Sequence, residues 1–186
     1  MKLTCTPPFE AKPGTIARLL NESYAELVET EPEVWEAEKA NWEKFDRDVY
    51  NNPDTIGACT FLTWYGSTMV GFFSFDPRSR PAYGVIGHNC ILPGYRKRGF
   101  GKQQVGEVLL RLKRYGIRQA RVSTNDHPFF FPAQRMYVAS GFVEVKRVLW
   151  NRDQRQNIIY YKKELDKELM QPTAFNGRLA PPFGRH

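Results

Sequence analysis

The sequence has few cysteines and no long hydrophobic run. Its 186 residues include three cysteines, Cys5, Cys59 and Cys90. Three is an odd number, and these are spread widely, which is typical of reduced thiols rather than of a disulfide framework or a zinc site. No run of about 18 apolar residues occurs, so the sequence predicts no membrane span. The N-terminal segment lacks the apolar stretch of a signal peptide, so we expect a cytoplasmic protein. The cysteine pattern also leads us to expect no metal site.

Acidic residues are scarce outside one segment of the chain. The net charge is +7, but residues 21–50 hold ten Asp and Glu against Lys39, Lys44 and Arg47. That segment is therefore −7 and the remainder is +14. A basic body with one acidic lobe suggests two ligands of opposite charge, or a nucleic-acid-binding protein with an acidic appendage. An exposed helix that happens to be acidic explains the same count, and the choice stays open here.

Hydrophobic periodicity and turn residues predict the order of the secondary-structure elements. We expect a strand at 2–6, a helix from 13, a second helix over 30–50, a hairpin over 59–76, a strand at 83–92, a helix at 99–115, a strand at 118–123, a helix at 131–140 and a hairpin over 142–165. The first hairpin is predicted to turn at Gly66-Ser67 and the last around 151–153. Thr30 is the predicted cap of the second helix, with Glu33 three residues later.

This order of elements predicts the fold class. Strands on both sides of a helix imply a crossover and a local parallel pair, whereas the flanking hairpins are antiparallel. We therefore expect an α/β protein with a mixed, mostly antiparallel sheet and helices on both faces. One domain is predicted over residues 1–166. The segment 167–186 is rich in Pro and Gly without a period, and we expect a flexible tail there.

A basic, glycine-rich segment precedes the helix at 99–115. "GYRKRGFGKQQ" places four cations at a helix N-terminus, where each one costs about 0.3–1 kcal/mol unless an anion is bound. Gly99 and Gly101 would let a polyphosphate approach the free backbone amides. The spacing fits neither a Walker loop nor a dinucleotide fingerprint, because Gln103 and Gln104 stand where those motifs need a hydroxyl and a glycine. A solvated basic turn is the alternative.

Two motifs resemble the GNAT family of acyl-CoA-dependent N-acyltransferases. "ILPGYRKRGFGKQQVGEVLL" is similar to the family's acetyl-CoA motif, with Arg96 and the Gly99-Phe100-Gly101 run in the matching positions. "FPAQRMYVASGF" resembles a second family feature, A-x-x-x-Y-x-x-x-G-F, which is matched by Ala133, Tyr137, Gly141 and Phe142. The resemblance covers about residues 55–165. One departure is Phe130, which stands where the family often has Asn, so Asn125 is the nearest substitute.

The resemblance implies a splayed central pair of parallel strands that holds acetyl-CoA as co-substrate. Backbone amides of residues 97–102 would cradle the pyrophosphate, and the strand ending at 90–92 would pair with the pantetheine arm. The residues that the resemblance assigns to acetyl-CoA are Cys90, Ile91, Leu92, Arg96, Lys97, Arg98, Gly99, Phe100, Gly101, Lys102, Asn125, Ala133 and Tyr137.

Two residues are candidates for catalysis on the same ground. Tyr137 would protonate the departing CoA thiolate, because a phenol has a pKa of about 10, close to that of the thiol; a packing role is the alternative. His88, three residues before Ile91, is the candidate base, acting directly or through water, although a structural role remains open. His127 is a weaker candidate and His186 is excluded. A backbone amide at Ile91 or Leu92 would polarise the thioester carbonyl.

The resemblance predicts an N-acetyltransferase acting on a small-molecule or peptide amine. Acidic and aromatic residues in the first two helices, among them Tyr24, Trp35 and Trp42, suit a cationic primary amine, although helix packing explains the aromatics equally well. A nucleic-acid-binding protein or a non-catalytic acyl-CoA sensor are the alternatives. Nucleic acid is disfavoured as a partner, because the cations cluster most tightly in the glycine-rich segment. The acceptor, the length of the acyl group and a homodimer are left open.

Overall fold

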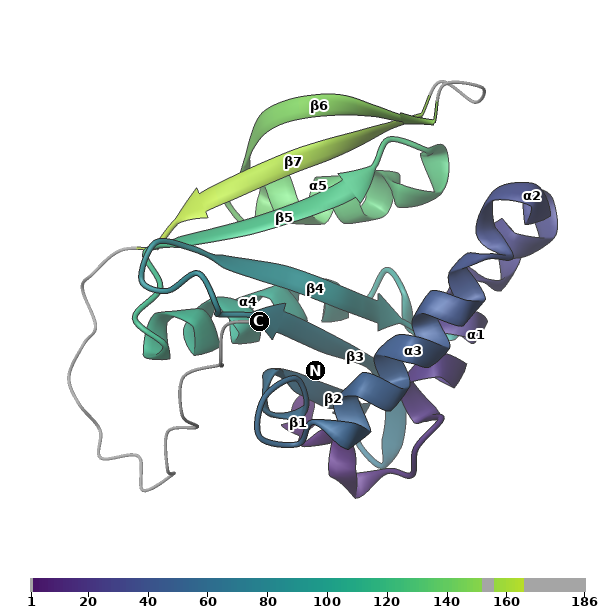
Figure 1. Cartoon of the computed structure of the whole chain (residues 1–186), viewed down its shortest axis with the longest axis horizontal. Coiled ribbons are helices and arrows are strands. Elements are labelled where there is room, and N and C mark those ends of the chain that lie inside the picture. The colour runs from purple at the N-terminus through teal and green to yellow at the C-terminus, as the bar shows by residue number, and fades with distance from the viewer. Residues whose placement is uncertain (1, 152–155, 166–186) are drawn as a thin grey trace.

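One mixed sheet runs through the protein (Figure 1). The computed structural model describes residues 2–151 and 156–165, and within them the strand order is β1-β2-β3-β4-β5-β7-β6. The strands are β1 (Thr4–Thr6), β2 (Thr60–Tyr65), β3 (Thr68–Asp76), β4 (Gly84–Ile91), β5 (Gln119–Asn125), β6 (Val143–Asn151) and β7 (Gln156–Glu164). The β4–β5 pair is parallel and the other neighbouring pairs are antiparallel. The predicted fold class is confirmed.

Helices cover both faces of the sheet (Figure 1). The helices are α1 (Thr15–Thr30), α2 (Pro32–Trp35), α3 (Glu38–Asn51), α4 (Phe100–Arg114) and α5 (Phe131–Ala139), with short 3₁₀ turns η1 (Pro8–Glu10), η2 (Gly57–Cys59), η3 (Pro93–Tyr95) and η4 (Pro128–Phe130). Side chains alternate between the faces, as the period of two in a strand requires. Phe61 and Phe73 belong to the core beneath α4, whereas Leu62 and Phe72 belong to the core beneath α1 and α3.

Several elements follow the sequence prediction closely. The hairpin of β2 and β3 turns at Gly66-Ser67, with Tyr65 opposite Thr68. The predicted apolar stripe of α4 is buried at Val105, Val108 and Leu112, and is half-buried at Leu109. Gly116 ends that helix in the left-handed region, at φ 72°. These elements are set by local periodicity and turn residues, which are visible in a single sequence.

The predicted second helix is wrong in two respects. It is divided into α2 and α3, and Thr30 does not cap it. The Thr30 hydroxyl donates to the Glu26 carbonyl at 2.9 Å, so it completes the end of α1 instead. Pro32 restricts the residue before it, and Glu31 accordingly leaves the helical region at φ −135°. The acidic segment is thus bent at Glu31, where α1 meets α2, rather than forming one continuous helix; we call this bend the elbow.

The parallel strands β4 and β5 separate soon after they pair. Their ladder consists of Gly84 opposite Ala120 and Val85 opposite Arg121. Figure 1 shows the two strands diverging toward the carboxyl end of β4. A β-bulge follows directly: the register with β3 shifts between Ile86 and Asn89, so β4 carries one extra residue there. A bulge bends its strand and breaks the ladder locally, which explains where the sheet opens.

The bulge also decides which side chains face which helices. Simple alternation from Ile86 would place Asn89 on the opposite face of the sheet. The extra residue returns Asn89 to the face of Ile86, beneath α4 and α5, and turns Cys90 toward α1. His88 faces α3, where its ring lies 4.7 Å from that of Phe45.

Two predictions lie outside the described residues. These are the turn around 151–153, most of which falls in the gap at 152–155, and the tail 167–186. No described helix is long and apolar enough to cross a membrane. Within residues 2–151 and 156–165, no group of three or more His, Cys, Asp or Glu side chains is placed to hold a metal ion.

Candidate active site

The glycine-rich segment forms the N-terminal cap of α4. Gly99 is the cap residue and has φ 78°, a left-handed conformation that strains residues with a side chain. Lys97 shares this region at φ 61°. The first amides of α4 have no intrahelical acceptor, since a helix leaves its first four N–H groups unsatisfied. Lys97, Arg98 and Lys102 are exposed around them, so an anion at this end would meet both amides and cations.

Gly101 has a packing role that the sequence interpretation did not include. A Cβ atom at Gly101 would lie 2.6 Å from the sulfur of Met136 in α5. The absence of a side chain therefore lets α4 and α5 approach closely. Phe100 is 1% exposed and packs in an apolar cluster with Leu3 and Val70, so its side chain faces the core.

Arg96 is held inside the protein rather than beside the free amides. Its guanidinium donates to the Ser23 carbonyl of α1 and, at 3.1 Å, to the Ile91 carbonyl of β4. It also lies over the Phe129 ring, 5.4 Å from the centroid. These contacts connect the end of β4 to α1 and to η4. Arg96 thus differs from the exposed Lys97 and Lys102, and from Arg98, which is exposed but donates to the Gly94 carbonyl at 3.2 Å within the same loop.

Tyr137 lies at the opening between β4 and β5. Its side chain comes from α5, is 3% exposed, and contacts the rings of Phe142 and Tyr161. The amide nitrogen of Asn89 donates to the Tyr137 hydroxyl at 3.3 Å and also to the Gly87 carbonyl at 3.1 Å. Burial raises the pKa of Tyr137 to about 12, and the hydrogen bond from Asn89 opposes that rise. Tyr137 therefore keeps its proton throughout the neutral range.

The backbone of β4 directs alternate amides into the same opening. The Leu92 N–H donates to the Val70 carbonyl at 2.9 Å, so it is used in the contact with β3. Hydrogen-bonded and non-hydrogen-bonded pairs alternate along an antiparallel ladder. The amides of Ile91 and Asn89 therefore point away from β3, toward β5. Of the two amides that the sequence suggested for polarising a carbonyl, Ile91 fits and Leu92 does not.

Cys90 faces the opposite side of β4. Its thiol is buried against the Leu19 carbonyl of α1, and burial raises its pKa to about 11. The thiol is therefore protonated and packed rather than reactive. Cys90 contributes its backbone to this part of the strand.

The structure does not bring His88 and Tyr137 together. Tyr137 contacts the neighbouring residue, Asn89, whereas His88 faces α3 on the other side of the sheet. Surrounding protein lowers the pKa of His88, and Glu38 partly opposes this. The His88 side chain is nevertheless exposed to solvent, so we expect that lowering to be modest. His88 is a neutral base at neutral pH, but it is not aligned with Tyr137.

His127 has a structural role. Its Nδ1 accepts from the Phe129 amide at 3.2 Å, so the ring proton of the neutral form is on Nε2, which donates to Glu31 at 2.9 Å. Glu31 also accepts from Trp35 and Gln156. This Glu31 network joins the elbow between α1 and α2 to the ends of β5 and β7. With both ring nitrogens engaged, His127 is unavailable as a base.

Asn125 is engaged within the protein as well. It is 5% exposed, its Nδ2 donates to Gln156 at 3.2 Å, and its Oδ1 accepts from the His127 amide at 2.7 Å. Both polar atoms of the side chain are therefore occupied at the end of β5. Ala133 is half-buried and packs against the core beneath α5.

Sequence reasoning missed Asn89 and Gln104, and it named Tyr24 and Trp42 without predicting that Phe129 joins them in one aromatic cluster. The cluster joins Tyr24 to Trp42 at 5.3 Å and to Phe129 at 5.7 Å between ring centroids, beside the opening at the end of β4. The Tyr24 hydroxyl reaches the Asn89 carbonyl at 3.5 Å. Asn89 gave no signal because the bulge that orients it is invisible in the sequence. Gln104 did give one: it is a polar residue on the buried side of α4.

Gln104 holds α4 to three strands. It is 2% exposed, and its Nε2 donates to the Thr63 hydroxyl at 2.9 Å and to the Phe72 and Cys90 carbonyls at 3.2 Å each. These contacts fix the start of α4 against the strands that form the opening.

Replacing Gln104 with Leu should lower the free energy of unfolding by about 2–3 kcal/mol, because three buried acceptors lose a donor. Urea unfolding measures this. The control is Gln103→Leu on the same helix, where the side chain is only half-buried and accepts from the Leu3 amide. A smaller loss is expected there. Equal losses in both variants would contradict the proposed role of Gln104.

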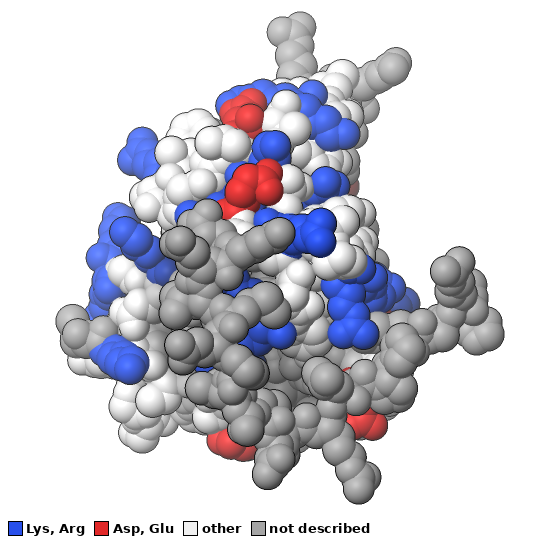
Figure 2. All heavy atoms as spheres, turned by 90° about the vertical axis from the view of Figure 1, so that its left-hand side faces the viewer, with Lys and Arg blue, Asp and Glu red and all other residues white. Residues whose placement is uncertain are grey.

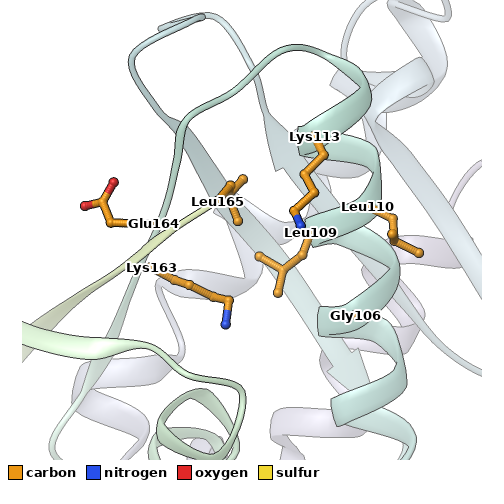
Figure 3. Close-up of a pocket in the computed structure, with 7 residues that line it drawn as sticks. All are labelled: Gly106, Leu109, Leu110, Lys113, Lys163, Glu164 and Leu165. Atoms are coloured by element: carbon orange, nitrogen blue, oxygen red, sulfur yellow. The ribbon is translucent and has the colours of Figure 1, made fainter. Parts of the chain in front are cut away.

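A shallow pocket lies away from the residues described so far (Figure 3). It has a volume of about 200 Å³ and separates α4 from the end of β7. Its lining residues are Gly106, Leu109, Leu110, Lys113, Lys163, Glu164 and Leu165. The predicted site residues are not among them, so the candidate active site is placed by Tyr137, β4 and the start of α4.

These features are typical of acyltransferases built on an α/β fold: a splayed sheet, a glycine cap at the start of α4 and a buried tyrosine on α5. The chain belongs to the acetyltransferase (GNAT) family, whose model matches residues 17–142. The resemblance stated from the two sequence motifs is confirmed. No curated protein sequence matches the chain significantly.

Solved structures share the fold at low sequence identity. A GNAT-family protein from Desulfovibrio desulfuricans superposes with a TM-score of 0.69 at 13% identity, over 89% of this chain and 99% of that one. Ard1 from Thermoplasma volcanium gives 0.63 at 15%, over 88% and 97%. A protein from Bacillus anthracis described as a streptothricin acetyltransferase, with acetyl coenzyme A bound, gives 0.51 at 17%, over 57% and 62%. At these identities the likeness is one of fold.

Proposed function

We propose that the protein transfers an acetyl group from acetyl-CoA to a primary amine. The observation that carries the proposal is the Tyr137 hydroxyl, which Asn89 holds at the opening between β4 and β5. The opening lies beside the glycine cap of α4, so an anion-binding helix end and a buried proton donor adjoin one strand. Family membership supports acyl transfer as the reaction class.

The residues at the start of α4 fit acetyl-CoA. The unsatisfied amides of the first turn and the exposed Lys97, Arg98 and Lys102 would hold the pyrophosphate. Arg96 would act indirectly, by keeping the end of β4 and the segment 97–99 in place. When bound, acetyl-CoA supplies an acetyl group activated as a thioester. The B. anthracis protein, solved with acetyl coenzyme A, supports the same choice of co-substrate.

Three groups of the chain would serve the reaction. The Ile91 amide, which points toward β5, would donate to the carbonyl oxygen as negative charge develops there. Tyr137 would hold a proton for the leaving sulfur. Its pKa of about 12 makes it a weaker acid than an ordinary phenol, so it would release the proton only as the thiolate forms. His88 would accept the amine's proton only through water, since it faces the other side of the sheet.

The acceptor would be a cationic amine with some apolar bulk. The acidic segment 21–50 folds into α1, α2 and α3, beside the end of β4. The aromatic cluster around Tyr24 borders the same region. A negative surface raises the local concentration of cations, and aromatic faces bind them. Glu31 and Asp46 would not take part, because His127, Trp35 and Gln156 already occupy Glu31 and the buried Asp46 accepts from backbone amides at the start of α1.

Acetyl-CoA should stabilise the protein against heat, whereas ATP and NADH should not. At about 100-fold excess over Kd the gain is about 2.7 kcal/mol by mass action. Thermal unfolding with each compound measures this, and longer acyl-CoA esters in the same assay define the acyl group. A panel of amines then identifies the acceptor by release of free thiol, with cationic arylalkyl amines expected to exceed acidic amines. No shift with acetyl-CoA would overturn the proposal.

A further inference from the structure

The end of the molecule opposite α2 carries a concentration of cations. It comprises the loop 77–83 between β3 and β4, residues 111–121 at the end of α4 and the start of β5, and residues 162–164 of β7. These 21 residues contain nine Lys and Arg and one carboxylate, Glu164, so they carry more net charge than the whole chain. We name this surface the basic end. Figure 2 shows Lys and Arg gathered on it, with few acidic side chains.

The fold brings the three segments together by direct contacts. The Arg118 amide donates to the Pro81 carbonyl at 3.0 Å, and the Leu165 amide donates to the Arg118 carbonyl at 2.8 Å. The Arg121 guanidinium lies over the Tyr83 ring, 3.7 Å from its centroid. The basic end is therefore assembled from residues that are far apart in sequence. Residues 111–121 alone hold five cations, but the sequence does not show that the loop 77–83 and residues 162–164 lie beside them.

Six of the nine cations of the basic end have no carboxylate partner in the described part of the chain. Arg78 is paired with Asp76, Arg111 with Glu107, and Lys162 lies 3.4 Å from Glu164. Lys163 donates to the Ser140 carbonyl, and Arg121 donates to the Gln119 side chain. The remaining four are Arg80, Lys113, Arg114 and Arg118, whose side chains make no ion pair or hydrogen bond within the described residues. An external anion at these four side chains would therefore not have to displace a carboxylate of the protein.

The candidate active site is at the other end of the molecule. Figure 1 shows α1, α2 and α3 at the carboxyl end of β4, whereas the basic end holds its amino end. The segment 21–50, with its charge of −7, would repel a polyanion from the acceptor side. A polyanion bound at the basic end would therefore leave the opening between β4 and β5 accessible. The polyanion would localise the protein and would not be its substrate.

We propose that the basic end binds the phosphate backbone of a nucleic acid, without reading the base sequence. Six of its nine cations are arginines, whose planar guanidinium groups suit phosphate oxygens. Lys113 and Lys163 come from facing elements on either side of the pocket in Figure 3, so one phosphate could meet cations from both. A membrane-binding surface also needs exposed apolar side chains. Leu110 alone, among the large exposed hydrophobics described, lines this region.

Fluorescence anisotropy with a short labelled DNA duplex tests the proposal on the full chain. Binding should be weak and steeply salt-dependent. With four phosphate contacts, log K should fall with log salt at a slope of about −3.6 between about 50 and 200 mM. The variant Arg80→Gln/Arg114→Gln/Arg118→Gln should bind at least about tenfold more weakly at the lowest salt, with a slope nearer zero by about 2.7. An RNA duplex in parallel shows which nucleic acid binds more tightly.

The matched control removes the same charge from the acidic side. Lys39→Gln/Lys44→Gln/Arg47→Gln takes three cations from α3, each paired with an acid there, and should leave duplex binding within about twofold, because those cations make no phosphate contact in the proposal. Equal losses in both triple variants would overturn the proposal in favour of a general charge effect. So would no duplex binding at low salt, or binding to phosphatidylserine vesicles alone. Thermal shift with acetyl-CoA, measured on each variant, checks the fold and the proposed function separately.

Discussion

Tyr137→Phe should lower kcat by about 10²–10⁴-fold while leaving the affinity for acetyl-CoA nearly unchanged, because it removes a proton donor and almost no volume. The hydroxyl is the polar atom of α5 that reaches the opening between β4 and β5, where Asn89 donates to it. Its pKa of about 12 lies above the unperturbed value, so Tyr137 stays protonated as the pH rises from 7 to 10. The wild-type rate should therefore not fall over that range through loss of this proton.

The matched control for this variant is Tyr161→Phe. Tyr161 is 4% exposed, and its ring centroid lies 6.2 Å from that of Tyr137, but it belongs to β7 rather than to α5. Its hydroxyl is not placed in the chemistry, so kcat should stay within about twofold. Steady-state and pre-steady-state rates on the same amine measure both variants. A Tyr137→Phe protein with an unchanged single-turnover rate would exclude Tyr137 as the acid.

Gly99→Val should weaken acetyl-CoA binding by about 100-fold or more, which would reduce the stabilisation at that concentration of ligand from about 2.7 to about 0.4 kcal/mol or less. Gly99 has φ 78°, a conformation in which a β-branched residue is strained. Its missing Cβ also faces open space at the first amides of α4, where the pyrophosphate is proposed to lie. The substitution would therefore displace the cap and obstruct the ligand. Calorimetric titration gives the affinity directly.

Gly94→Val is the control for Gly99→Val. Gly94 lies in the same loop, also faces open space, and is not in the left-handed region. Its affinity for acetyl-CoA should remain within about threefold of wild type, since neither strain nor obstruction is expected there. The melting temperature of each ligand-free variant separates damage to the fold from damage to binding. If Gly99→Val bound as tightly as Gly94→Val, the segment would be only a solvated basic turn.

Elements set by local pattern could be predicted from the sequence, whereas those set by register could not. The stripe of α4 and the turn at Gly66-Ser67 follow from period and turn chemistry, and both are present. The boundary between α1 and α2 depends on how Thr30 is satisfied, because its hydroxyl bonds back to Glu26 rather than forward. A bond back to α1 and a bond forward to the next helix would each satisfy the Thr30 hydroxyl. Tertiary packing at the elbow therefore decides between them, and the local sequence does not.

The candidate site shows the same division. Motif resemblance located Tyr137 and the glycine cap, because both are recognisable as residue types at fixed spacing. The positions of His88 and Asn89 depend on one extra residue in β4, and simple alternation assigns them to the wrong faces. The partners of Arg96, Asn125 and His127 come from elements distant in sequence. Their internal roles could not be read from the residues alone.

A single extra residue in β4 determines where the sheet opens to form the candidate site. The parallel ladder ends at Val85, and the extra residue comes between Ile86 and Asn89. A β4 shorter by Gly87 would keep Asn89 on the same face and keep every residue assigned to the cofactor. It would lose the bend, so β4 and β5 would continue to pair and seal the opening. A one-residue deletion in β4 would thus close the opening between β4 and β5. The sequence motifs assigned to acetyl-CoA would all remain.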